Sequence, residues 1–139
     1  MMTQSELAAY YRDVTIQATG GEGQSTVIEH FDGQRLRMRV LVEQHYQRPG
    51  GTVSGPALFA LVDGAGWMMA VGQHGVGADA FTTDVTMHFL RPVPLGEVVV
   101  EASALKRGKR HVFEVEVQPG PDGPAIYATI AFSIRTAAR

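Results

Sequence analysis

The chain has 139 residues, of which 12 are Lys or Arg and 14 are Asp or Glu, so its formal net charge is −2. This length suits a single domain with a sizeable core, here taken as 1–139, and the small charge argues against a nucleic-acid-binding face or attraction to an anionic membrane. No cysteine is present, which excludes disulfides, thiolate nucleophiles and Cys-based zinc sites. Neither a signal peptide pattern nor a membrane-length apolar run is found, so we expect a soluble, cytoplasmic protein.

The first predicted elements are a short amphipathic helix over residues 5–12 and a strand over residues 35–42, separated by a Gly- and Ser-rich loop at 20–25. The strand prediction depends on strict alternation, with one face formed by Leu36, Met38, Val40 and Val42. The opposite face carries Arg35, Arg37 and Arg39, which fits either an exposed edge or an interface.

A nearly all-apolar helix is predicted to follow, from about residue 55 to the glycines at 72–77. Ser54 can cap it, Gly55 leaves its amide unobstructed, and Pro56 suits a first helical turn. A helix that is apolar on all sides must be buried. A lone carboxylate in such a helix is costly unless it is hydrogen-bonded or has chemistry to perform. Asp63 is therefore a candidate functional residue, and the alternative is a structural acid bonded to loop amides or to Thr82.

Two glycines, Gly64 and Gly66, lie in the middle of this helix. Each costs about 1 kcal/mol of helix propensity relative to alanine. We therefore expect neighbouring groups to approach the helix closely there, and the alternative is that the helix ends early.

Four consecutive antiparallel strands are predicted after the helix, at residues 81–90, 98–105, 111–118 and 125–136. The short connections at 106–110 and 119–124 predict antiparallel neighbours. Alternation within 81–90 places Thr82 on the face opposite Val85 and Met87. The predicted fold class is α+β, with about five strands in an antiparallel sheet that curls around one long helix, and a second molecule or sheet covering the rest of the helix.

Several sequence blocks occur here in a distinctive order. They are Gly-Thr-Val-Ser-Gly-Pro at 51–56 with Leu-Val-Asp at 61–63, the Thr-Thr-Asp-Val-Thr-Met-His-Phe-Leu-Arg-Pro run at 82–92, a Leu-Gly-Glu turn, and Leu-Lys-Arg-Gly-Lys-Arg at 105–110. From about residue 48 to 136 the chain resembles the hotdog-fold acyl-CoA thioesterases of the PaaI-like group. The resemblance implies a hotdog fold, a homodimer or homotetramer with sites at the subunit interface, an acyl-CoA substrate, and no cofactor.

The resemblance also implies roles for individual residues. Asp63 matches the carboxylate that activates water or attacks the thioester. Gly55 matches the residue whose backbone N–H polarises the thioester carbonyl, and Thr82 matches a hydroxyl that helps to position water from the other subunit. Basic residues at family turns meet the phosphates of coenzyme A, which gives three further candidates: Arg91, Arg107 and Lys109.

The helix start departs from the commonest family pattern. Many relatives have His-Gly-Gly preceded by an Asn, whereas this chain has Ser54-Gly55-Pro56, with Arg48 at the Asn position. Ser54 either caps the helix or takes over part of the missing function. The departure keeps open a second hypothesis, a non-catalytic acyl-CoA-binding or acyl-CoA-sensing protein on the same fold. A hotdog dehydratase is disfavoured because no Asp–His pair lies near the helix start.

The proposed chemistry needs few groups. A thiol with a pKa near 8.5 leaves as thiolate with little acid assistance, so the protein must activate a nucleophile and hold the developing oxyanion. The first amides of a helix suit the second task. Eight residues separate Gly55 from Asp63, about 12 Å of helix rise. Asp63 is interpreted as general base rather than nucleophile.

The sequence also bears on a serine nucleophile, a metal site and the role of the large apolar side chains of the helix. The spacing at Ser54 is not that of a nucleophile elbow, so a serine-hydrolase triad is disfavoured. The five histidines lie too far apart in sequence to predict a metal site: His30, His45, His74, His88 and His111. Trp67, Met68 and Met69 are predicted to pack in the core or the dimer interface, and alternatively to line an acyl pocket.

Overall fold

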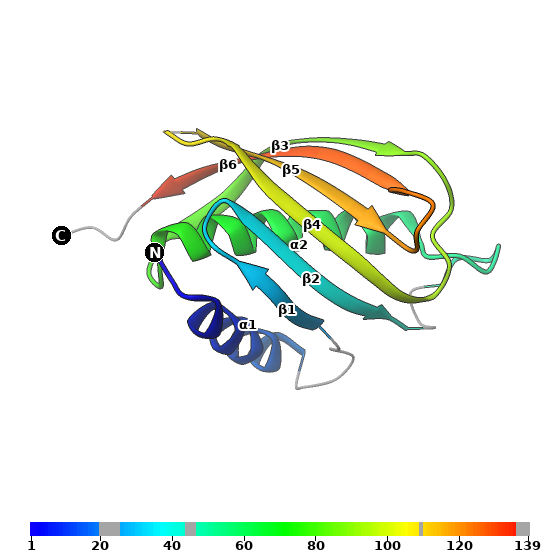
Figure 1. Cartoon of the computed structure of the whole chain (residues 1–139), viewed down its shortest axis with the longest axis horizontal. Coiled ribbons are helices and arrows are strands. Elements are labelled where there is room, and N and C mark those ends of the chain that lie inside the picture. The colour runs from blue at the N-terminus through cyan, green and yellow to red at the C-terminus, as the bar shows by residue number, and fades with distance from the viewer. Residues whose placement is uncertain (20–25, 44–46, 109, 136–139) are drawn as a thin grey trace.

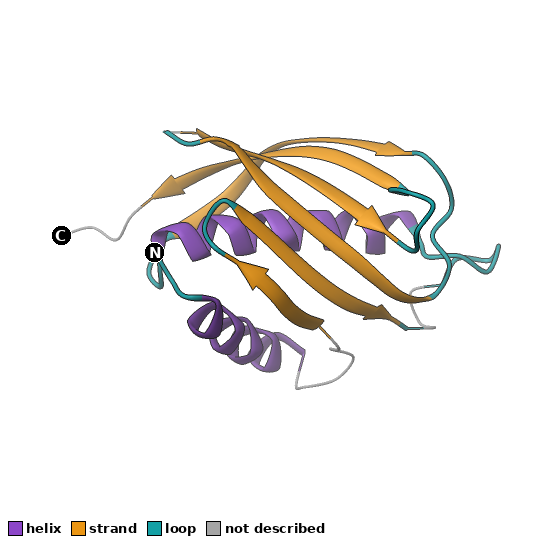
Figure 2. Cartoon of the chain, viewed as in Figure 1, coloured by secondary structure: helices purple, strands orange, loops and turns teal. Residues whose placement is uncertain are grey.

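The computed structural model describes residues 1–19, 26–43, 47–108 and 110–135. Its helices are α1 (Gln4–Thr19) and α2 (Gly55–His74), and its strands are β1 (Thr26–Phe31), β2 (Arg35–Val42), β3 (Asp79–Phe89), β4 (Gly96–Lys106), β5 (Arg110–Gln118) and β6 (Ile126–Arg135). The six strands form one antiparallel sheet in the order β1-β2-β4-β5-β6-β3. The sheet curves around α2, as Figures 1 and 2 show. This arrangement confirms the predicted α+β hotdog fold.

The core lies between α2 and the concave face of the sheet. Val62, Ala65, Met68 and Met69 of α2 have no exposed surface. Length and hydropathy alone would let α2 cross a membrane, but half of its most apolar stretch is buried inside the fold. Core packing therefore accounts for its apolar sequence, and the two methionines belong to the core as predicted.

The two central glycines of α2 differ in their surroundings. A Cβ atom on Gly66 would lie 2.6 Å from Cε2 of Phe132 and 3.0 Å from Cγ2 of Ile130 on β6. A Cβ atom on Gly64 would meet nothing within 4 Å. The predicted close approach is thus confirmed at Gly66 alone, and the alternative of an early helix end is wrong because α2 continues to His74.

The N-terminal region differs from the prediction in two ways. Helix α1 runs well past residue 12, and β1 is a strand that the sequence pattern did not predict. Only Ile28 and Phe31 of β1 are buried, and a register shift falls between Ile28 and His30, so the strand shows no regular alternation. The Gln4 side chain accepts a hydrogen bond from the Phe31 amide and donates to the Ile28 and Glu29 carbonyls, so α1 covers this edge of the sheet.

The strand order corrects a second expectation. The hairpins β4–β5 and β5–β6 form as predicted, but β3 pairs with β6 rather than with β4. The segment after β3 contains Pro92 and Pro94, which lack an amide hydrogen and cannot form a ladder between adjacent strands. Val93, between them, is fully buried and accepts a hydrogen bond from the Val53 amide. The connection therefore crosses beside the start of α2, and β3 lies at the edge of the described sheet.

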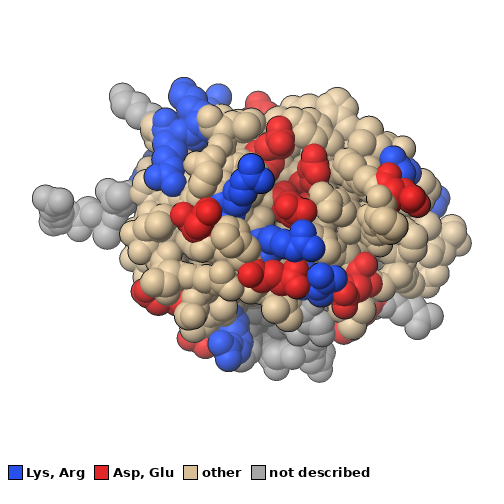
Figure 3. Space-filling view, in the orientation of Figure 1, with Lys and Arg blue, Asp and Glu red and all other residues tan. Residues whose placement is uncertain are grey.

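The convex face of the sheet carries interleaved charges (Figure 3). Glu29 bridges Arg37 and Arg39, which also bond Glu101 and Glu97 on β4. The two guanidinium groups lower the pKa of Glu29. Strand β2 lies between β1 and β4, so an exposed sheet edge is excluded for its arginines, and Arg37 and Arg39 instead form a solvent-facing ion-pair network.

Candidate active site

The start of α2 presents an amide to an open groove. Ser54 has φ −67° and ψ 152°, and its hydroxyl accepts a hydrogen bond of 3.3 Å from the Ala57 amide, so Ser54 is a helix cap. The first amides of a helix have no intrahelical acceptor, and the described residues supply none to Gly55. A Cβ atom on Gly55 would meet nothing within 4 Å. The amide predicted to bind an oxyanion is therefore accessible.

A groove of about 380 Å³ lies at this helix start, and its lining includes Arg48, Thr52, Gly55, Leu58, Phe89 and Arg91. Arg48 donates to the Thr52 hydroxyl at 3.3 Å, and Arg91 donates to the Asp122 carbonyl at 3.0 Å. Both guanidinium groups are exposed and retain further N–H donors. Two cations beside a helix N-terminus favour an anionic ligand. Arg48 was not a predicted ligand, and only its place just before the helix could have suggested it.

Asp63 lies on the one face of α2 that the sheet leaves open. Pro56, Phe59 and Ala60 on this face are exposed, while Asp63 and Gly64 are half-buried. The Thr82 hydroxyl of β3 donates a hydrogen bond of 2.5 Å to Oδ1 of Asp63. Among the described residues this is the only hydrogen bond to the carboxylate. Asp63 is therefore neither sealed in the core nor bonded to its own main chain.

The facing of Thr82 differs from the prediction of strict alternation. Its side chain faces the helix and its hydroxyl contacts Asp63 of the same chain, while its action on a site of another subunit stays a prediction. The cause is a bulge, since the β3–β6 register shifts between Thr82 and Asp84 and leaves Thr83 as the extra residue. A one-residue shift reverses the facing of every side chain beyond it. Thr82 and Val85 therefore both face inward, against strict alternation.

The predicted basic residues are not brought together. Arg91 lines the groove. Arg107 lies at the opposite end of α2, where it donates to the Gly33 carbonyl at 2.9 Å, next to His74 and His111. Lys109 lies outside the described residues. Within one chain, Arg107 therefore cannot contact a ligand bound at Gly55.

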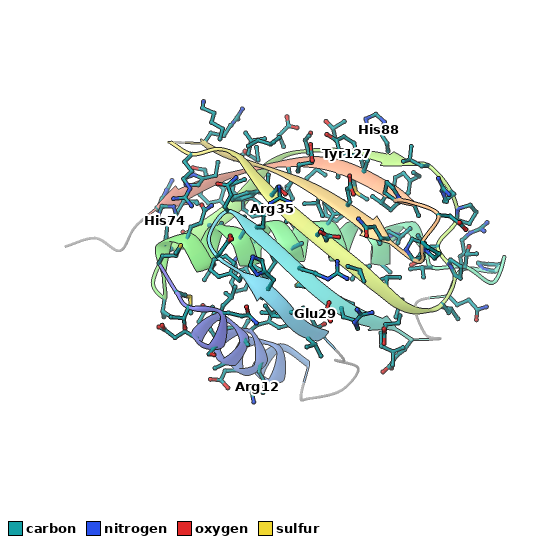
Figure 4. All side chains as sticks on the ribbon, in the orientation of Figure 1. Arg12, Glu29, Arg35, His74, His88 and Tyr127 are labelled. Atoms are coloured by element: carbon teal, nitrogen blue, oxygen red, sulfur yellow. The ribbon has the colours of Figure 1, made fainter. Side chains whose placement is uncertain are left out.

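Two of the five histidines meet, although they lie far apart in sequence. Nε2 of His74, at the C-terminal end of α2 (Figure 4), lies 2.9 Å from Nε2 of His111 on β5. His111 is buried, and its Nδ1 has no partner among the described groups. Burial is the largest cause lowering the pKa of both rings, and Arg107 contributes to both. No cluster of three or more metal-binding side chains occurs in the described ranges.

Comparison with known proteins decides the family. A model of the thioesterase superfamily matches residues 50–125, a range that includes Gly55, Asp63 and Thr82. The chain belongs to the thioesterase superfamily. The activity of this family, hydrolysis of a thioester, agrees with an accessible helix-start amide and a carboxylate on the open face of the same helix. No curated protein sequence matches this thioesterase.

Solved structures support the same assignment. A candidate thioesterase from Silicibacter sp. TM1040 is 30% identical, with a TM-score of 0.82 over 97% of this chain and 93% of that one. A thioesterase from Haemophilus influenzae is 17% identical, with a TM-score of 0.80 over 100% and 94% of the two chains. A hypothetical thioesterase from Streptococcus pneumoniae TIGR4, solved with coenzyme A, is 16% identical, with a TM-score of 0.74 over 83% and 89%. The last two show a shared fold.

Proposed function

We propose that this thioesterase hydrolyses an acyl-CoA or aryl-CoA to the free acid and coenzyme A. The observation that carries the proposal is the open face of α2, which exposes the Gly55 amide at its start and Asp63 two turns further on. In this proposal the Gly55 amide holds the developing oxyanion and Asp63 is the general base that takes a proton from water. Removing one oxyanion donor costs two to three orders of magnitude in turnover in other enzymes.

The hydrogen bond from Thr82 supports the role of Asp63. It occupies Oδ1 and fixes the rotation of the carboxylate, which leaves Oδ2 to accept a proton from water. The water adds to the thioester carbon, the C–S bond breaks, and the thiolate leaves and is protonated by solvent. No cofactor is needed for this step.

The groove at the helix start suits the coenzyme A end of the substrate. Arg48 and Arg91 both line it and offer free guanidinium donors, which favours phosphate binding. The Streptococcus pneumoniae relative was solved with coenzyme A. Arg107 lies near the C-terminal end of α2, about 30 Å along the helix axis from Gly55. In our proposal Arg107 and Lys109 therefore bind the phosphates of a ligand that is held mainly by a second copy.

We further propose that a second copy completes the site. Asp63 lies about 12 Å along the helix axis from Gly55, at the limit of what a bound carbonyl and one water can bridge. The exposed face of α2 and the unpaired edge β3 are available to a copy related by a two-fold axis, whereas Gln4 blocks the opposite edge at β1. An antiparallel second α2 would bring its own Asp63 toward Gly55. The expected assembly is a homodimer, which can pair further into a tetramer.

Asp63→Asn distinguishes hydrolysis from non-catalytic acyl-CoA binding. The second hypothesis remains because the helix starts with Ser54-Gly55-Pro56 in place of His-Gly-Gly. We expect the wild type to release thiol from an acyl-CoA panel, and Asp63→Asn to lose at least 100-fold in kcat because the base is removed, with binding of a non-hydrolysable thioether analogue retained. The matched control is Asp84→Asn, which removes a carboxylate on the outer face of β3, the strand that carries Thr82. Analogue binding by a wild type that releases no thiol would instead establish the binding protein.

A further inference from the structure

The open face of α2 stops abruptly one turn after Asp63. Phe59 and Ala60 are exposed, but Ala70 and Val71, which continue the same face toward the C-terminus, are buried. Helix α1 lies beneath the C-terminal half of α2 in Figure 1. The Met2 amide bonds the Gly72 carbonyl at 2.8 Å, and Leu7 of α1 is fully buried. The N-terminal segment thus packs against α2 beyond Asp63, toward the C-terminal end of the helix.

The boundary between the open and covered parts is an aromatic pair. The Tyr10 ring of α1 stacks on Trp67 of α2, with centroids 6.0 Å apart and planes 23° apart. Trp67 follows Asp63 by four residues, so the two lie on one face, about 6 Å apart along the axis. Gly64 adjoins Asp63 on this face and leaves free space where a side chain would stand. A space beside the carboxylate is therefore bounded at one end by two rings.

We infer that Tyr10 and Trp67 form the end wall of the acyl-binding space and restrict this thioesterase to compact acyl groups, such as a short chain or a single ring. This inference rests on the proposed function, because it places the thioester carbonyl at Asp63. The thioester carbonyl joins two parts of the substrate, the pantetheine arm of coenzyme A and the acyl group. The pantetheine arm of coenzyme A contains amides that lose hydrogen bonds on burial, whereas an acyl arm is apolar and gains by contact with aromatic rings. The aromatic wall therefore suits the acyl arm.

Through the stacking contact, α1 positions a side chain of the proposed acyl-binding space. Trp67 is held in position by a ring from a separate element, so truncation of Tyr10 frees Trp67 to move without changing α2 itself. Both residues are positioning and size-limiting groups in this inference, since neither carries a proton or charge to the reaction.

The test is the dependence of kcat/KM on acyl length, measured with butanoyl-, hexanoyl-, decanoyl- and dodecanoyl-CoA. We expect the wild type to prefer butanoyl- over dodecanoyl-CoA at least 10-fold, and Trp67→Ala and Tyr10→Ala each to raise the dodecanoyl-to-butanoyl ratio at least 10-fold. Tyr10→Phe preserves the stack and should keep the wild-type ratio. The matched control is Tyr127→Ala, which removes an aromatic ring from the outer face of the sheet, where it contacts His88 and Glu114.

Two results would overturn the inference. One is an unchanged length ratio in folded Tyr10→Ala, which is informative even where Trp67→Ala fails to fold. The other is an equal rise in KM for every chain length, which would place the pantetheine arm against the rings. If the wild type releases no thiol from any substrate, the proposed function is contradicted but the inference is still testable. The dodecanoyl-to-butanoyl preference is then measured as a ratio of dissociation constants for thioether analogues of the same chain lengths.

Discussion

Asp63 and Thr82 illustrate how a single hydrogen bond decides what a residue can do. A half-buried carboxylate on an otherwise apolar helix needs a donor, and Thr82 supplies one without adding charge. A lysine or arginine in that place would form an ion pair and compete with water for the carboxylate. The hydroxyl holds one oxygen and leaves the other available, which is the arrangement that a general base requires.

Thr82→Val should therefore reduce turnover while the fold persists. Valine has nearly the shape of threonine but cannot donate, so Asp63 loses its orientation, and we expect kcat to fall about 10- to 100-fold, the size typical for loss of a supporting hydrogen bond to a functional ligand. Thr82→Ser restores a donor and should recover most of the rate. Thiol release from the best acyl-CoA substrate measures both. Wild-type turnover in Thr82→Val would contradict the positioning role.

The sequence predicts the residues on α2 better than those on the strands. Ser54, Gly55 and Asp63 belong to one helix whose start is set by local signals, so their relative positions follow from helical geometry. The facing of Thr82 depends on a bulge that no local pattern around Thr83 indicates. The separation of Arg107 from Arg91 depends on which end of the sheet each turn occupies, which only the assembled topology determines.

At the level of elements, α2 packs closely against β6 because Gly66 has no side chain at their contact. Gly66 lets Phe132 and Ile130 approach the helix backbone, while Gly64, two residues earlier, borders open space. The two glycines have the same intrinsic helix cost. They therefore form a matched pair in which packing alone differs.

Alanine substitution at the two glycines should change the free energy of unfolding in opposite directions. Gly66→Ala places a methyl group against the buried Phe132 ring and should destabilise the fold by about 1–3 kcal/mol, since overpacking outweighs the gain in propensity. The added methyl group of Gly64→Ala meets no neighbour among the described residues, so this variant should stabilise the fold by up to about 1 kcal/mol. Urea unfolding measures both free energies. Equal effects at the two positions would show that the contact with Phe132 carries no energetic weight.

The contact between α2 and β5 should make stability depend on pH. Burial, Arg107 and, for His74, the N-terminal amino group lower the pKa values of His74 and His111 below the ordinary value near 6.5. Between the lowered and ordinary values the unfolded chain binds more protons than the folded one, so stability is full above about pH 6.5 and falls as the pH drops below it.

Thermal unfolding at pH 8 and pH 5 tests this dependence. The wild-type Tm should fall on acidification, and the double variant His74→Gln/His111→Gln should lose less, because neither amide titrates. The Tm of the double variant at pH 8 measures any stability lost through changed packing, so its fall between pH 8 and pH 5 reports titration alone. An equal fall of Tm in both proteins would assign the pH dependence to other groups.

For the whole molecule, the sequence predicts the layers but not the order of the strands. Apolar periodicity and short turns are enough to predict a helix enclosed by an antiparallel sheet and the two hairpins β4–β5 and β5–β6. Two features escape because their causes are not local: β1 is stabilised by Gln4, 27 residues before Phe31, and β3 crosses to β6 because a proline-containing connection passes beside α2. Both decide which edge of the sheet stays free, and hence where a second copy can pack.

The free edge and the open face of α2 lead to a prediction about assembly. Phe59 is 44% exposed on that face, and Leu41 is 43% exposed on β2. Burying one such side chain between two copies contributes about 1.5–3 kcal/mol, and a two-fold interface uses each residue twice. Phe59→Arg should therefore convert the proposed dimer to a monomer and abolish thiol release, because the two halves of each proposed site separate. Leu41→Arg, equally exposed on a different element, should keep both the dimer and the activity. Light scattering coupled to size exclusion gives the mass of each variant, and an active monomer in Phe59→Arg would show that one chain holds a complete site.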